Sequence, residues 1–377
     1  MDLRFSERDE TFRREARAWL QAHLEHMPHG SGDTREGFAE HLRWERLLFE
    51  AGWAVVAWPR AYGGRDASLM QWLIFEEEYW GAGAPQRVTQ NGIFLLAPSI
   101  FGFGTEEQKR RLLRPIAAAE CLWAQGWSEP GAGSDLASLR SRAERVEGGF
   151  RLYGQKTWTT RGAFCDKIFG PFRSDPGAPA HAGLTYFLVP LRAEGVSVRG
   201  SARLDGDEGF ADVFLDGVFV PDSDVLGGVG NGWKVAMATT SSERALSLRS
   251  PGRFMATAER LRELCKQSPR GADPVLRDRV VRALLDVEAY RFHTFALATR
   301  MQAGSPLGPE ASLSKLFWSE LDVAMHETAL ALLGDEAELE NAWTKQYQFA
   351  LAGPIYAGTN EIQRNVVAER VLGLPRK

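Results

Sequence analysis

The segment WSEPGAGSDLASL, residues 127–139, is the first candidate for chemistry. Gly131 and Gly133 permit backbone torsions that other residues avoid, and they let a ligand approach the main chain closely. Ser128 and Ser134 add hydroxyl groups beside backbone N–H donors. A plain polar turn after a strand has the same composition, and no lysine-bearing phosphate loop follows. On composition alone, the polar turn is the simpler of the two interpretations.

Two further segments could contact a planar or an anionic ligand. The first is GQKTWTTRG, residues 154–162, in which Trp158 could stack on an aromatic ring while a threonine hydroxyl donates to that ring. A tryptophan packed at a domain interface explains this segment equally well. The second is the C-terminal IYAGTNEIQRNVVAERVLGLPRK, where Gly358 precedes Thr359 at the expected start of a helix. A helix N-terminus can bind a phosphate, although ordinary capping gives the same pattern.

One acidic residue stands out as a candidate base. Glu243 lies in GNGWKVAMATTSSERALSL, an apolar helical stretch, and burial there would raise the pKa of its carboxyl toward that of a general base. The alternative is an ion pair at the surface. His23, His26 and His29 recur every three residues near a helix end, but no carboxylate or cysteine accompanies them. We therefore predict no metal site.

Three regions with different secondary structure must position these residues. Helical periodicity dominates up to about residue 122, with Ser6 and Thr105 as helix-starting residues. Short β-branched and aromatic runs separated by turn residues follow, and after Gly232 helical periodicity returns, beginning with a long segment over Trp233–Cys265. We predict an α+β protein with an N-terminal helical domain, a middle antiparallel β-barrel-like domain and a C-terminal helical bundle, at residues 1–122, 123–228 and 229–377.

Composition narrows the class of protein. The 377 residues are 44% hydrophobic and 25% charged, which is typical of a folded globular protein of two or three domains. A net charge of −4, with arginines interleaved with acids, argues against nucleic-acid binding. Three widely spaced cysteines indicate a reducing compartment. The longest apolar run is too short to span a membrane and the N-terminus lacks a leader's apolar core, so we expect a cytoplasmic protein.

Taken together, these segments resemble the acyl-CoA dehydrogenase family over essentially the whole chain. The matching sequences are WPRAYGG (58–64), FGTEEQKRRLL (103–113), SEPGAGSD (128–135), GQKTWTT (154–160) and AGTNEIQRNVVAERVLGLPR (357–376). Their order and spacing together are specific to that family, whose fold is also helical, then β, then helical. The resemblance implies an FAD cofactor held between the β-domain and the C-terminal helices, with part of the dinucleotide reaching a neighbouring subunit.

The resemblance also implies roles for individual residues at the cofactor. Trp158 matches the tryptophan that stacks on the flavin, and Thr160 matches the hydroxyl that bonds near flavin N5. Trp127 and Ser128 match the strand end at the pyrimidine side of the ring. The positions that touch the FAD phosphates or adenosine correspond to Thr359 and Glu361.

The chemistry implied is α,β-dehydrogenation of an acyl-CoA thioester: a carboxylate takes the α-proton while the β-hydrogen leaves as hydride to flavin N5. Many members carry this base in a Tyr-Glu-Gly-Thr tail, where this chain has Tyr356-Ala357-Gly358-Thr359. A minority place it in a Glu-Arg pair on the helix after the β-domain, and Glu243-Arg244 occupies that place. We therefore predict Glu243 as the base, and as substrate-binding residues Ser134, Arg244, Tyr356 and Ala357, the last through its backbone N–H.

Two family motifs that bind the FAD of the adjacent subunit are missing. Residues 266–278 read KQSPRGADPVLRD in place of Arg-x-x-Phe-Gly, and residues 332–341 read LLGDEAELEN in place of a Gly-Gly-containing Gln motif. We favour an FAD-dependent dehydrogenase of acyl-CoA or acyl-carrier thioesters, a homo- or hetero-oligomer with an electron-transferring flavoprotein as acceptor. The alternatives are a non-catalytic or half-site partner subunit of a heteromeric enzyme, and a flavin oxidase or monooxygenase on the same fold.

Overall fold

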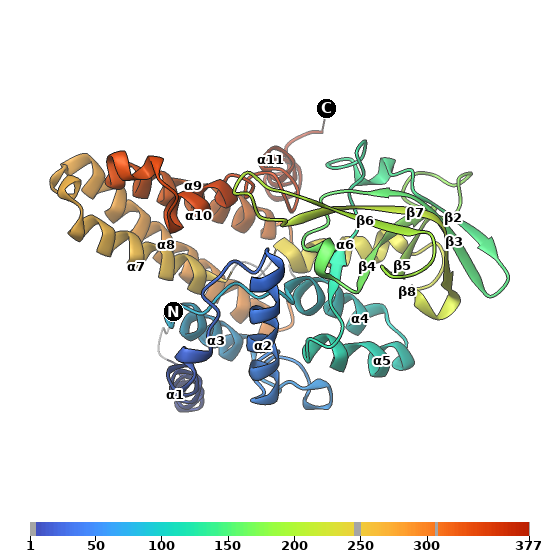
Figure 1. The fold of residues 1–377 in the computed structure, drawn as a ribbon, viewed down its shortest axis with the longest axis horizontal. Coiled ribbons are helices and arrows are strands. Elements are labelled where there is room, and N and C mark those ends of the chain that lie inside the picture. Colours follow the sequence, from blue (N-terminus) through green and yellow to red (C-terminus); the bar gives the residue numbers. More distant parts are fainter. Residues whose placement is uncertain (1–4, 245–249, 306–307, 377) are drawn as a thin grey trace. The chain divides into compact units, whose positions relative to one another are not determined.

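The computed structural model describes residues 5–244, 250–305 and 308–376, and at residues 241–244 it describes the backbone only. Helices occur up to residue 117, strands between 123 and 226, and helices again from 232, which confirms the predicted α+β class (Figure 1). The chain forms two compact units. We call them the sheet unit (Pro28–Asp66 and Gln86–Glu243) and the helical unit (Met1–Met27, Ala67–Pro85 and Arg244–Lys377).

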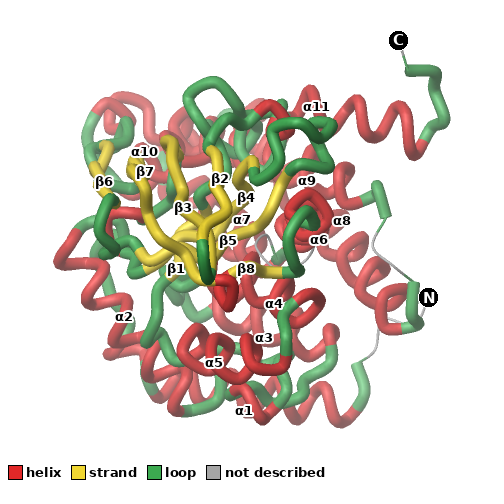
Figure 2. Tube along the Cα trace, turned by 90° about the vertical axis from the view of Figure 1, so that its right-hand side faces the viewer, coloured by secondary structure: helices red, strands yellow, loops and turns green. Residues whose placement is uncertain are grey.

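The sheet unit contains one sheet with the strand order β6-β7-β3-β2-β4-β5-β8, and β1 pairs with β4 (Figure 2). Most neighbours are antiparallel, but β1 and β2 each pair with β4 in parallel, which the sequence prediction missed. Buried aromatic rings such as Phe150 and Phe187, 5.0 Å apart, lie in its core. The strands are β1 (Trp123–Gln125), β2 (Arg142–Val146), β3 (Gly149–Lys156), β4 (Lys167–Arg173), β5 (Leu184–Pro190), β6 (Val196–Ser201), β7 (Phe210–Pro221) and β8 (Val225–Leu226).

One helix of the sheet unit, α5 (Glu106–Ala117), begins where its capping residues predict. Thr105 and Gln108 form the expected capping box: the Gln108 backbone N–H donates to the Thr105 hydroxyl at 3.1 Å, and the Thr105 N–H donates to Gln108 Oε1 at 3.0 Å. The helices are α2 (Arg35–Glu50), α4 (Ala97–Phe103), α5 (Glu106–Ala117) and α6 (Gly232–Arg244), and a π-helical turn spans Asn91–Leu96.

The helical unit packs around Phe254, Trp318 and Met325, which are buried. Ser6 caps its first helix as predicted. The single helix predicted over Trp233–Cys265 was wrong: Ser250 has an extended backbone, and a new helix starts at Pro251, where a proline suits the first helical position. The helices are α1 (Glu7–Ala22), α3 (Leu69–Gly81), α7 (Pro251–Gln267), α8 (Pro274–Gln302), α9 (Ala311–Leu333), α10 (Ala342–Ala350) and α11 (Asn360–Val366).

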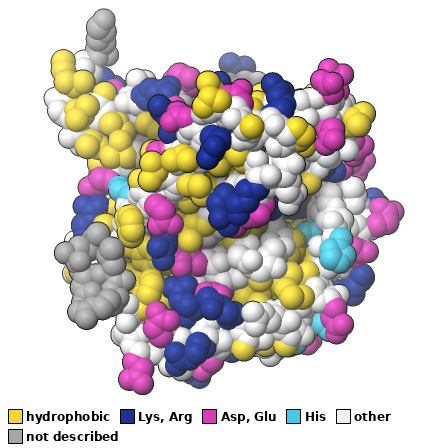
Figure 3. Space-filling model, turned by 90° about the vertical axis from the view of Figure 1, so that its left-hand side faces the viewer, with side chains coloured by type: hydrophobic (Ala, Val, Ile, Leu, Met, Phe, Trp, Pro, Cys, Tyr) yellow, Lys and Arg dark blue, Asp and Glu magenta, His cyan; other side chains and the backbone are white. Residues whose placement is uncertain are grey.

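Several large hydrophobic side chains of the helical unit are exposed. Val281, Leu285 and Phe292 recur at helical spacing along α8. Figure 3 shows one face of the molecule, on which hydrophobic side chains lie in patches among charged ones. Of the helices in the described ranges, none combines the length and the apolar character needed to cross a bilayer.

Candidate active site

The structure brings Trp127 and Ser128 beside the end of β3. The Thr157 N–H donates to the Ser128 carbonyl at 2.9 Å, so the chain after β1 is tied directly to the segment that contains Trp158 and Thr160. The Trp127 indole is buried, and its Nε1 donates to the Tyr186 hydroxyl at 3.0 Å. The indole of Trp127 is therefore part of the core, and only the main chain of this residue can contact a ligand.

A buried ion pair holds the same two segments together. Lys156 Nζ, with no exposed surface, lies 2.9 Å from Glu129 Oε1 and donates to the carbonyls of Trp127 at 3.3 Å and Pro171 at 3.0 Å. Glu129 also accepts from the backbone N–H groups of Arg140 at 2.6 Å and Ser141 at 3.0 Å.

Burial opposes ionisation of Glu129, but the charge of Lys156 and these backbone donors hold the pKa of its carboxyl below its usual value. Sequence analysis assigned no role to this pair, although both residues lie within the quoted segments SEPGAGSD and GQKTWTT. The sequence feature that could have indicated this pair is one lysine and one glutamate in segments that otherwise contain small, hydroxylated and aromatic residues.

Trp158 presents an aromatic face to solvent. Its side chain is 66% exposed and its ring packs edge-on against Phe210 at 5.6 Å. Its φ of +57° lies in the left-handed region, which costs a non-glycine residue about 1–2 kcal/mol. The next residue, Thr159, is buried and anchored: its N–H and hydroxyl both donate to the Ala211 carbonyl, at 3.1 and 2.6 Å. The turn is thus held by Thr159, which leaves the Trp158 ring available to a planar ligand.

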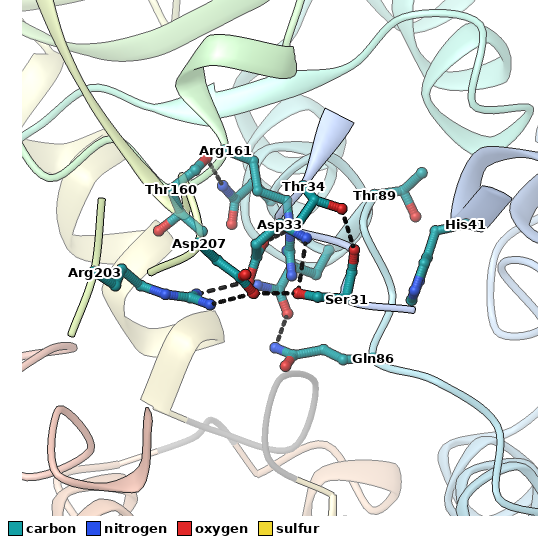
Figure 4. A network of polar contacts seen from close by, with 12 residues as sticks. Ser31, Asp33, Thr34, His41, Gln86, Thr89, Thr160, Arg161, Arg203 and Asp207 are labelled. Atoms are coloured by element: carbon teal, nitrogen blue, oxygen red, sulfur yellow. Dashed lines mark hydrogen bonds and ion pairs between the residues drawn. The ribbon is translucent and has the colours of Figure 1, made fainter. Parts of the chain in front are cut away.

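Thr160 and Arg161 lead from this turn into a polar cluster (Figure 4). Asn91 Nδ2 donates to the Thr160 carbonyl at 3.4 Å. Arg161 Nε lies 2.6 Å from Asp33 Oδ1, and Arg203 Nη1 lies 2.6 Å from Asp33 Oδ2. Burial would raise the pKa of Asp33, but the charges of Arg161 and Arg203 outweigh it and lower that pKa. Sequence analysis missed this cluster entirely.

Ser134 and Glu243 lie elsewhere in the sheet unit. Ser134 is exposed in the glycine-rich loop. Glu243 and Arg244 are the last two residues of α6, and their side chains lie outside the described residues. The helix that holds them is anchored one turn earlier: the Thr239 and Ser99 hydroxyl oxygens are 2.7 Å apart, both side chains are buried, and Thr239 Oγ1 donates to the Val235 carbonyl at 3.0 Å.

Replacing Thr239 by Val should weaken the packing of α6 by about 1–3 kcal/mol. The buried Ser99 hydroxyl then loses its 2.7 Å contact and keeps only the Leu95 carbonyl at 3.4 Å. A lower midpoint of thermal unfolding is the expected result. Thr240→Val is the matched control, since Thr240 is only partly buried and its hydroxyl bonds locally to the Met237 carbonyl at 2.8 Å. Equal unfolding midpoints for the two variants would contradict this view of the Ser99–Thr239 contact.

The C-terminal candidates lie in the helical unit, in a turn before α11. Tyr356 packs against Trp318 and Phe349, with ring centroids 5.9 and 6.4 Å apart. Ala357 and Gly358 follow in left-handed conformations, with φ of +56° and +83°. The buried Gln363 Nε2 donates to both of their carbonyls, at 3.4 and 3.2 Å. This amide fixes the turn at the position where the sequence has alanine.

The remaining tail candidates are on α11. The Thr359 hydroxyl accepts the Ile362 N–H at 3.3 Å and so caps the helix, while Glu361 is exposed in its first turn. Asn360 is buried, and its Oδ1 accepts from Lys315 Nζ at 2.6 Å and from the Ser319 hydroxyl at 3.1 Å. These buried polar contacts from α9, which sequence analysis did not predict, hold the start of α11 in place.

Comparison with known proteins identifies the family. Models of the acyl-CoA dehydrogenase N-terminal, middle and C-terminal domains match residues 6–120, 124–218 and 230–372. The chain belongs to the acyl-CoA dehydrogenase family. The resemblance found in its sequence motifs is confirmed, and the protein is an oxidoreductase of this family.

Among its relatives, acyl-CoA dehydrogenase IpdE1 of Mycobacterium tuberculosis is 38% identical over 382 residues, 98% of each chain. Two solved structures are similar over the full length of both chains. They are the Tcur3481-Tcur3483 steroid acyl-CoA dehydrogenase (27% identical, TM-score 0.86) and the ChsE4-ChsE5 complex of M. tuberculosis (28%, TM-score 0.85). Within the described ranges of this family member, no three His, Cys, Asp or Glu residues group as metal ligands would.

Proposed function

We propose that this acyl-CoA dehydrogenase binds FAD and removes hydrogen from the α and β carbons of an acyl thioester, with Glu243 as the base. The observation that carries the assignment of the base is the tail Tyr356-Ala357-Gly358-Thr359, which offers no carboxylate at the position where many family members hold theirs. Glu243 lies on the helix after the β-domain, the other place used by the family, one helical turn beyond the anchored Thr239.

The described residues fit a flavin. The exposed face of Trp158 would stack on the planar ring, the Thr160 hydroxyl would donate to a ring nitrogen, and the main chain at Trp127 and Ser128 would meet the pyrimidine side. Thr359 would bind near the phosphates. Hydrogen bonds to its own backbone N–H and to Thr359 keep the pKa of Glu361 below its usual value. This carboxylate therefore suits the adenosine hydroxyls better than a phosphate.

Bound FAD would supply the acceptor for the hydride, and residues of the protein would remove the α-proton. Glu243 would take the α-proton, which is too weakly acidic to leave unless the charge that develops on the thioester oxygen is stabilised. The Ala357 backbone N–H is the donor that we assign to this oxygen. Its turn is fixed by Gln363, so the N–H can be positioned before substrate arrives.

The assembly is the second part of the proposal. The two intersubunit FAD motifs are missing from this chain. One of its structural neighbours is named as the ChsE4-ChsE5 complex, and another has the paired name Tcur3481-Tcur3483. The exposed hydrophobic side chains of α8 offer apolar surface for such a contact. We infer that the active enzyme is an oligomer in which another chain, identical or related, completes the FAD contacts, and that an electron-transferring flavoprotein reoxidises it.

The experiment that tests this function is the visible absorption spectrum of the purified chain, alone and co-expressed with a related chain, followed by anaerobic addition of an acyl-CoA. A flavin spectrum that the acyl-CoA bleaches supports the dehydrogenase. If flavin is retained only with the related chain, the heteromeric assembly is supported over the homo-oligomer. A bound flavin that no acyl-CoA bleaches contradicts the proposal, and rapid reoxidation of the bleached flavin by oxygen favours the oxidase alternative.

A further inference from the structure

The guanidinium of Arg161 is buried without enough hydrogen-bond acceptors. Its side chain is 5% exposed, and Nε pairs with Asp33 Oδ1 at 2.6 Å, but Nη1 has no hydrogen-bond partner within the described part of the chain. Buried polar groups in folded proteins are nearly always bonded, because an unsatisfied donor costs about 1–3 kcal/mol, and more when it is charged. An arginine held in this state points to an acceptor supplied from outside the chain.

The backbone keeps Arg161 in this position. Its φ of +56° is left-handed, and its N–H donates to the Gly209 carbonyl at 2.9 Å. Thr160, the residue assigned to the flavin, directly precedes it. Thr89 adds a second buried hydroxyl with no hydrogen-bond partner among the described residues, two positions before Asn91, whose amide binds the Thr160 carbonyl. In Figure 4, Arg161, Asp33 and Ser31 gather at the centre of the cluster, and the Gln86 amide below them donates to Gln90 Oε1 at 3.0 Å.

The charges of the cluster restrict what this acceptor can be. Arg203 lies 2.6 Å from Asp33, 2.8 Å from Asp205 and 3.5 Å from Asp207, so Asp33 is shared between Arg203 and Arg161. Three carboxylates thus face two guanidinium groups. Another carboxylate would add like charge to a buried site that already has an excess of it, whereas a neutral oxygen accepts a hydrogen bond at no such cost.

We propose that Arg161 donates a hydrogen bond to an uncharged oxygen, a keto or hydroxyl group, on the acyl part of the thioester substrate. The inference rests on the proposed function and specifies its substrate class: acyl groups with a polar substituent beyond the reacting carbons. A site that is built to bond such an oxygen discriminates against the plain acyl chain, because its donor is then left buried and unpaired.

A matched series of thioesters tests this specificity on the FAD-loaded enzyme, with its partner chain if one is required. The series is heptanoyl-CoA, its 4-, 5- and 6-oxo derivatives, and pimeloyl-CoA, which has a terminal carboxylate. Anaerobic stopped-flow reduction of the flavin gives an apparent Kd and a rate for each. We expect at least one oxo derivative to bind about tenfold more tightly than heptanoyl-CoA, and pimeloyl-CoA to bind more weakly than that derivative.

Variants link the preference to Arg161. The double variant Arg161→Met/Asp33→Asn removes one positive and one negative charge. In it the tighter binding of the oxo derivatives should vanish, while heptanoyl-CoA should keep its apparent Kd. Arg161→Lys keeps the charge and is the second variant if the first does not fold; it should lose most of this tighter binding.

If every thioester of the series reduces the flavin and all bind with equal affinity, this inference is overturned, because Arg161 then binds an ordered water only. The proposed function would remain intact. A loaded flavin that no member reduces would overturn the proposed function, and this inference with it.

Discussion

Replacing Glu243 by Gln should lower the rate of flavin reduction by about 10²–10⁴-fold, the range that a positioned general base supplies. Glutamine keeps the size of the side chain but cannot accept the α-proton, so binding of flavin and thioester should change little. Anaerobic stopped-flow spectroscopy measures the reduction rate and the apparent Kd separately. We expect a much lower rate of flavin reduction and an unchanged apparent Kd for the thioester.

Glu259→Gln is the matched control, because Glu259 lies on α7, is exposed and pairs with Arg262 on the same helix. It should reduce its flavin at the wild-type rate. If Glu243→Gln does the same, Glu243 is a surface residue and the base lies elsewhere. Adding Ala357→Glu to Glu243→Gln places a carboxylate at the tail position used by many family members, and partial recovery of the rate would show that both positions reach the same proton.

Lys156→Met should destabilise the protein by about 3–5 kcal/mol, since breaking a buried ion pair leaves an uncompensated charge behind. Glu129 would be that charge, and the carbonyls of Trp127 and Pro171 would lose their donor as well. For a chain of 377 residues we expect the unfolding midpoint to fall by about 4–6 °C. Bound FAD should also be lost, because Trp127 and Ser128 are no longer held beside β3.

Lys109→Met provides the comparison, because Lys109 pairs with the largely exposed Glu106 on the same helix and such a pair contributes little. The pH dependence gives a second readout. A carboxyl with a lowered pKa in the folded state contributes stability above its unfolded pKa and loses it as the pH falls. Wild-type stability should therefore decline below about pH 4.5 more steeply than that of Glu129→Gln/Lys156→Met. Identical slopes would show that the pair does not titrate with unfolding.

Local features of this fold could be predicted from sequence, and long-range features could not. Ser6 and Thr105 cap their helices as predicted because a cap depends on residues three positions away. The parallel pairing of β1 with β4, and the contact of Asp33 with Arg203 170 positions later, depend on tertiary structure and leave no periodic signal.

The same division applies to the candidate site. Trp158 and Thr160 were identified through a motif resemblance, and their roles at a flavin stay predictions. Lys156, Glu129 and Arg161 lie in or beside those motifs, yet their roles depend on burial and on partners that sequence spacing does not reveal. Glu243 stays a prediction from the motif and from its place on α6.

In the mechanism that we propose, the turn at Ala357 keeps the backbone N–H that binds the thioester oxygen, while the base lies on α6. Gln363 grips the carbonyl oxygens of the turn, so the path of the main chain there is set by the helix that follows and is indifferent to which side chain residue 357 bears. An unbranched side chain at residue 357 could therefore be exchanged without moving the N–H beside it, whereas its left-handed φ disfavours β-branched residues. If the base lies on α6 as we propose, one substitution in the tail and one on α6 are enough to change its position. No sequence between the two arrangements would need a different backbone.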